Sequence, residues 1–90
     1  MLVLPAELTH AQATASLRML LQGLRSQQGA VVIDATPLTR FDSSALAVLL
    51  QCRRESVAVG RSFSVRALPA RLTALATLYG VAELLPQHPA

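Results

Sequence analysis

The residues best suited to chemistry lie in the segment Arg40-Phe-Asp-Ser-Ser44, which brings a carboxylate and two hydroxyls to the predicted start of a helix. The simplest interpretation is helix capping. Asp and Ser at the first positions accept hydrogen bonds from free backbone N–H groups and suit the positive end of the helix dipole. Losing such a cap costs about 1 kcal/mol.

A second interpretation of the same segment is functional. Open α/β sheets place their functional groups where a helix begins beyond the carboxyl end of a strand. A phosphate on Ser43 would be favoured there by the helix dipole and by free amides, and Arg40 is close enough in sequence to pair with it. Ser43 is therefore a candidate phosphorylation site.

The helix that begins at Asp42 is predicted to have two different faces, because an α-helix has 3.6 residues per turn. The outward face carries small and polar residues: Ser43, Ala47, Gln51 and Arg54. The core face carries Ala45, Val48, Leu49 and Cys52, with Leu46 on its flank. Leu50 projects near Ser43 and Ala47, so it is either a partly exposed contact residue or is buried by a neighbouring element.

Catalytic and metal chemistry find little support in the sequence. A hydrolase or phosphotransferase that used Ser43 would need a base, but His10 and His88 lie near the chain ends. Asp34 is predicted to end a strand and Asp42 to cap a helix, so they do not make a catalytic pair. The glycines are scattered, and the single cysteine, Cys52, excludes an internal disulfide. We therefore predict no enzyme activity, no metal and no cofactor.

Composition excludes further classes of protein. The hydrophobic fraction of 52% excludes intrinsic disorder, and no window approaches the ~18 apolar residues of a membrane span. Eight arginines against five acids give a net charge of +3, but the arginines are spread along the chain and aromatics make up only 3%. This excludes nucleic-acid binding as the expected function. Ninety residues without a signal peptide predict a single cytoplasmic domain, residues 1–90.

The predicted elements alternate between strands and helices. We expect strands at 1–4, 30–34 and 61–67, and helices at 10–27, at 42–56 and from about residue 70 to Gly80, followed by a short turn in 81–86. Residues 35–41 are predicted to form a loop. The continuous apolar run in 30–34 indicates a strand covered on both faces, whereas the alternation in 61–67 indicates a half-buried one. The third helix aligns Leu72, Leu75, Ala76 and Tyr79. This order predicts an α/β layer fold with parallel strands.

Two stretches of the chain resemble a known family. The run Val31-Val-Ile-Asp34, a loop, and then Phe41-Asp-Ser-Ser-Ala-Leu46 resemble the strand–loop–helix signature of STAS domains. Residues 46–50, Leu-Ala-Val-Leu-Leu, and the ending from Leu75 to Pro86, with its Leu-Ala-Thr-Leu-Tyr start, are similar to one branch of that family. Its members are small cytoplasmic subunits of the ABC systems that move phospholipid between the Gram-negative membranes. The resemblance implies a single STAS domain with a small, mostly parallel sheet and about three helices.

The resemblance also implies a function. A chain of this branch would be a non-enzymatic subunit that docks on the ATPase of an ABC transporter, with the permease in the same complex and the membrane contacted only through it. The implied docking residues, at the start of the second helix and along its outward face, are Arg40, Asp42, Ser43, Ser44, Ala47, Leu50, Gln51 and Arg54. An anti-sigma-factor antagonist, bound by a kinase and switched by phosphorylation of Ser43, is the alternative within the family.

The family usually has an additional strand before the equivalent of residues 1–4. Its absence from the given sequence predicts a more exposed sheet edge, which invites pairing with a second copy of the chain or with a partner.

Overall fold

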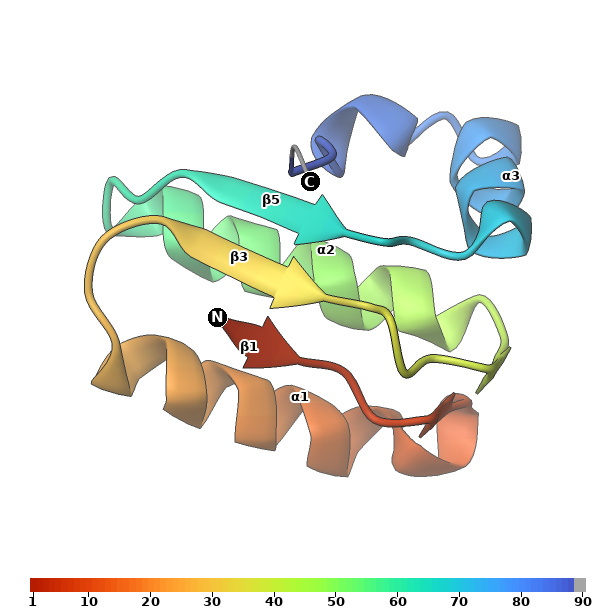
Figure 1. Cartoon of the computed structure of the whole chain (residues 1–90), viewed down its shortest axis with the longest axis horizontal. Coiled ribbons are helices and arrows are strands. Elements are labelled where there is room, and N and C mark those ends of the chain that lie inside the picture. Colours follow the sequence, from red (N-terminus) through yellow and green to blue (C-terminus); the bar gives the residue numbers. More distant parts are fainter. Residues whose placement is uncertain (89–90) are drawn as a thin grey trace.

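The computed structural model describes residues 1–88 and confirms the α/β class (Figure 1). In chain order the elements are β1 (Leu2–Val3), β2 (Glu7–Leu8), α1 (His10–Ser26), β3 (Val31–Asp34), β4 (Arg40–Phe41), α2 (Ser44–Ala58), β5 (Phe63–Arg66), α3 (Ala70–Leu78) and the 3-10 helix η1 (Ala82–Leu84). The first predicted helix is confirmed to within one residue, and the second extends two residues beyond its predicted end.

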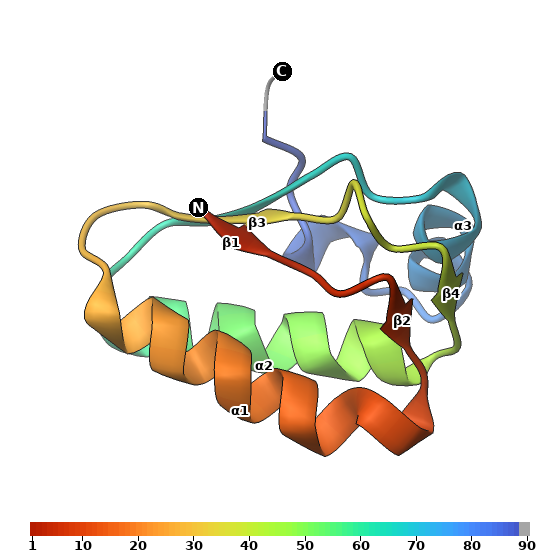
Figure 2. The ribbon, with the colours of Figure 1, turned by 60° about the horizontal axis from the view of Figure 1, so that its bottom comes forward.

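The main sheet has three parallel strands in the order β1-β3-β5. Figure 2 shows α1 and α2 side by side along one face of this sheet. Val31 and Ile33 of β3 are buried toward these helices, whereas Val32 and Asp34 alternate to the opposite face and are only half-buried. The prediction that this strand is fully covered on both faces is therefore wrong, because both long helices pack on the same face.

The core lies between the sheet and the α1–α2 pair. Its largest fully buried side chains include Leu4 and Leu8 before α1, Ile33 in β3 and Leu49 in α2. Gly23 lets α1 approach β1 closely, because a Cβ at this position would lie 2.7 Å from a terminal methyl of Leu2. Among the described residues, no helix combines the length and the apolar character needed to cross a membrane.

A second, two-stranded sheet pairs β2 with β4, in the segment that was predicted to be a loop. Glu7 lies opposite Arg40 and Leu8 opposite Phe41. The backbone N–H groups of Thr39 and Arg40 both donate to the carbonyl of Ala6, at 2.9 and 3.0 Å. This short ladder brings the beginnings of α1 and α2 together.

Two predicted element ends are corrected by backbone geometry. Ala67 has a φ of 58°, which is left-handed and incompatible with a strand, so β5 ends at Arg66. Tyr79 follows the last residue of α3 and is 56% exposed, so it does not continue the buried stripe of Leu72 and Ala76. Gly80, with a φ of 73°, is confirmed as the residue that takes the left-handed turn after the helix.

The two edges of the main sheet differ. At the β5 edge, the C-terminal tail adds a parallel bridge between Val65 and Gln87. At the opposite edge, β1 pairs with β3 as its one neighbour strand within residues 1–88. Pairing of this edge with a second copy of the chain stays a prediction.

Candidate functional site

Asp42 joins the beginnings of both long helices. One carboxylate oxygen, Oδ1, accepts the backbone N–H of Ser44, the first residue of α2, at 2.8 Å. The other, Oδ2, accepts the backbone N–H of His10, the first residue of α1, at 3.1 Å. Because α1 and α2 are parallel, a single negative charge faces the positive ends of two helix dipoles.

These hydrogen bonds determine the charge state of Asp42. The N–H of Ser44, followed by that of His10, lowers the pKa of the Asp42 carboxyl below its ordinary value of 3.8, since both bonds favour the ionised form. Asp42 is therefore a fixed negative charge at neutral pH. The capping interpretation is confirmed for this residue, and the cap extends to a second helix that lies 32 residues earlier in the chain.

Ser43 behaves differently from its neighbour. It occupies the N-cap position of α2, yet its side chain makes no capping hydrogen bond and the residue is exposed. The capping interpretation is therefore wrong for the Ser43 hydroxyl. The amides expected to favour a phosphate are also occupied: the N–H of Ala45 donates to the Asp42 carbonyl at 3.1 Å, and that of Leu46 to the Ser43 carbonyl at 3.1 Å.

The predicted faces of α2 are confirmed. Ala45, Val48, Leu49 and Cys52 are all buried, as is Leu46 on their flank. Ala47 and Arg54 are exposed, whereas Gln51 is half-buried. Leu50 is also half-buried and packs against the core, so it lies at the boundary between the two faces.

The other predicted docking residues lie at the start of this face. Arg40 is exposed on β4, and Ser44 is half-buried in the first turn of α2. The guanidinium of Arg71, from α3, lies 5.6 Å from the ring centroid of Phe41, next to Arg40. The candidate site therefore combines β4, the first turns of α2 and the beginning of α1.

The residues of α1 that border this site could not be identified from the sequence. A hollow of about 260 Å³ lies between α1 and α2, next to the predicted docking face. It is lined by Ala13, Thr14, Leu17, Ala47, Val48 and Gln51. Helical periodicity places Ala13 and Leu17 on one stripe of α1, but only packing determines that part of this stripe stays open beside Ala47.

The groups considered for catalysis have local roles. Asp34 accepts the hydroxyl of Thr36 and also its backbone N–H, the latter at 3.0 Å, and these bonds, that of the hydroxyl first, lower the pKa of Asp34. His10 lies closer to Ser43 than its sequence position indicated, because its backbone bonds to Asp42, but no hydrogen bond between its imidazole and Ser43 is present in residues 1–88. Burial, with a smaller effect of Glu55, raises the pKa of the Cys52 thiol to about 12, as befits a small hydrophobic core residue.

Comparison with models of protein families gives a match over almost the whole chain. A family model described as "Mlab, STAS domain" matches residues 1–86, which includes the whole candidate site. No curated protein matches the sequence.

Proposed function

The chain belongs to the STAS domain family, in the branch described as MlaB, and we propose that it is a non-enzymatic accessory subunit of an ABC-type phospholipid transporter. In this proposal the domain docks on the ATPase subunit through the start of α2 and supports the assembly or activity of the complex. It reaches the inner membrane only through that complex.

The observation that best supports this proposal is the contrast between Asp42 and Ser43. Asp42 accepts backbone N–H groups from two helices, which holds the surface around it in one shape. Ser43 is exposed beside it with a hydroxyl that has no capping role. An exposed hydroxyl on a rigid helix start suits a protein contact, and the adjoining small side chain of Ala47 allows close approach of a partner.

The same arrangement offers a way to regulate docking. A phosphate on Ser43 would add roughly two negative charges next to the Asp42 carboxylate, where the nearest amides already have acceptors. Like-charge repulsion and added bulk would therefore weaken a contact that approaches this surface closely. We propose that phosphorylation, where it occurs, releases the partner.

The test is purification of the tagged, full-length chain from its own host, followed by identification of the proteins that co-purify. The expected result is an ABC ATPase with its permease. Recovery of a kinase that controls a sigma factor would overturn the transport proposal in favour of the anti-sigma-factor antagonist.

Two substitutions then test the site itself. Ser43→Asp and Ser43→Arg should strongly reduce recovery of the ATPase while leaving the domain folded by circular dichroism. Ser64→Asp is the matched control, because Ser64 of β5 alternates with the buried Phe63 and Val65 and so lies on the sheet face opposite the helices. If both Ser43 variants recover the ATPase as well as the native chain does, docking occurs through another surface.

A further inference from the structure

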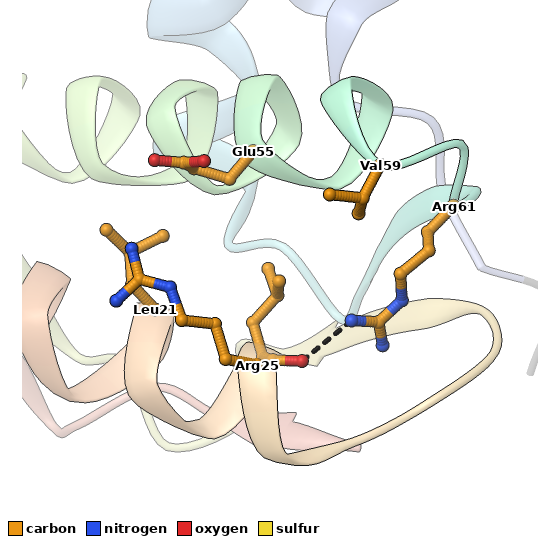
Figure 3. A pocket seen from close by; sticks show the side chains of 6 residues that line it. Leu21, Arg25, Glu55, Val59 and Arg61 are labelled. Atoms are coloured by element: carbon orange, nitrogen blue, oxygen red, sulfur yellow. Dashed lines mark hydrogen bonds between the residues drawn. The ribbon is translucent and has the colours of Figure 1, made fainter.

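The space between α1 and α2 contains a second hollow, farther along the helices. Its volume is about 240 Å³, and it is lined by Leu21, Leu24, Arg25, Glu55, Val59 and Arg61. Figure 3 shows Glu55 and Val59 from the α2 side facing Leu21 and Arg25 of α1, with Arg61 at the end of the hollow. Val59 is 64% exposed, which is high for a β-branched apolar residue next to an apolar hollow.

The two hollows lie on one line. On α1, Leu21 follows Leu17 by four residues, so the second hollow begins one helical turn after the first. On α2, Glu55 follows Gln51 by the same interval. Because the helices are parallel, these two steps run in the same direction and have the same length. We call the two hollows together the α1–α2 groove. From Ala13 to Arg25 it extends about 18 Å at 1.5 Å per residue.

The rim of the groove is basic. Arg25 and Arg61 line the second hollow. Arg18 is exposed seven residues before Arg25, on the same side of α1, and Arg54 is exposed seven residues after Ala47 on α2. Glu55 is the one acid among the residues that line either hollow. Four arginines against one glutamate give the groove a net positive charge.

We propose that the α1–α2 groove binds an acidic amphipathic helix of the partner that docks at Ser43. This inference rests on the proposed function and extends its contact surface from the start of α2 to its end. Apolar side chains spaced seven or eight residues apart on such a helix would enter the two hollows, and flanking carboxylates would pair with the rim arginines. A flat, anionic membrane would reach the rim but not the recessed apolar floor, so the hollows favour a helix.

The test uses two synthetic helical peptides of about 15 residues and the full-length chain. Both peptides have leucines at positions i, i+4, i+7 and i+8, and the remaining positions are mainly Glu in one peptide and mainly Lys in the other. Amide chemical shifts in NMR titrations report affinity and location. The acidic peptide should bind and shift the amides of Leu17, Ala47 and Val59, whereas the basic peptide should not bind.

Charge reversal provides the variant test. The double variant Arg18→Glu, Arg25→Glu should weaken binding of the acidic peptide about tenfold or more, because both exposed side chains lie on the rim. Because Arg25 also lies in the last turn of α1, circular dichroism checks that the variant is folded. Arg66→Glu is the matched control, since Arg66 is exposed at the end of β5, in register with Asp34 on the sheet face opposite the helices. Equal binding of both peptides, equal loss in the control, or shifts confined to the sheet face would overturn the proposal.

Three further outcomes are informative, and the first and the last separate this proposal from the proposed function. If the double variant still recovers the ATPase from the host while Ser43→Asp does not, docking at Ser43 stands and the groove proposal is wrong. If anionic lipid vesicles bind the chain and compete with the acidic peptide at the same arginines, the groove is a membrane contact and the helix proposal is overturned. Failure to recover any ATPase, with the peptide result as expected, removes the transport function and leaves the groove.

Discussion

At each end of the α1–α2 pair, one charged side chain bonds to free backbone groups, and the two side chains have opposite charges. At the beginning, the Asp42 carboxylate accepts backbone N–H groups from both helices. At the end, the Arg61 guanidinium donates to the carbonyl of Leu24 in the last turn of α1 and to that of Gly29 in the following loop, each at 2.7 Å. Each charge faces the helix ends whose dipole attracts it, and each satisfies backbone groups that a helix end leaves without partners.

The two ends differ in the number of helices to which the charged side chain is hydrogen-bonded. Asp42 joins α1 to α2, whereas Arg61 serves α1 and its loop, and α2 ends on backbone hydrogen bonds from Val59 to Ser56 and Val57. The first end is consequently closed and polar, with one exposed hydroxyl at Ser43. The second stays open as an apolar hollow beside Arg25 and Arg61. A partner that covered both ends would therefore meet two kinds of surface, which favours one docking direction.

The largest change in stability should come from Leu49, which tests the assignment of the buried and outward faces of α2 between its two ends. Leu49 is fully buried midway along α2, so Leu49→Ala should lower the free energy of unfolding by about 2–5 kcal/mol. Urea unfolding followed by circular dichroism measures this change. Gln51→Ala, on the outward side, should change it by less than about 0.5 kcal/mol. Similar losses in both variants would mean that the assigned faces of α2 are wrong.

The next largest change in stability is expected at the end of the helix pair that contains Arg61. Arg61→Ala removes two charge-assisted hydrogen bonds to carbonyls, one of them partly buried, and should cost about 1–2 kcal/mol in the same unfolding measurement. Arg54→Ala is the control, because Arg54 is exposed on the rim. Its effect should stay within about 0.5 kcal/mol. If the two variants are equally stable, the Arg61 contacts do not stabilise this end.

The acidic end is best tested by pH. Because folding lowers the pKa of Asp42, its stabilisation is complete above the ordinary value of 3.8 and is lost as the pH falls through the lower, folded pKa. Asp42→Asn should therefore be less stable than the native chain at pH 7, and its stability should fall less below pH 4. Thermal unfolding at pH 7 and pH 3 compares the two. Asp34, whose pKa is also lowered, leaves a residual dependence in both proteins. Parallel pH profiles would show that Asp42 does not join the helices.

The smallest effect is expected at Ser43. Since its hydroxyl makes no capping hydrogen bond, Ser43→Ala should change the free energy of unfolding by less than about 0.5 kcal/mol. Urea unfolding of this variant beside Asp42→Asn gives the comparison directly. A loss of about 1 kcal/mol, which is typical of a removed N-cap, would assign the hydroxyl a structural role and weaken the argument for docking.

Local patterns in the sequence were sufficient for much of this architecture. The 3.6-residue period predicted both faces of α2, because side chains four residues apart share a side whatever surrounds the helix. The same period placed Cys52 in the core, and the tolerance of glycine for a left-handed conformation placed Gly80 at a helix end. The capping prediction at Asp42-Ser43-Ser44 was confirmed for the carboxylate and wrong for the Ser43 hydroxyl, because both residue types cap helices and only the backbone geometry selects between them.

The sequence by itself determined the order of the three helices and of the three strands of the main sheet, the buried side of α2 and the family signature, since each depends on residues close together in the chain. Tertiary structure alone decided that β2 pairs with β4, that Asp42 bonds to His10, and that two hollows stay open between α1 and α2. These features join residues some 30 positions or more apart. Which residues meet is decided when both helices pack against the same sheet face. Two-residue strands and a single carboxylate produce no periodic pattern in the sequence from which these contacts could be predicted.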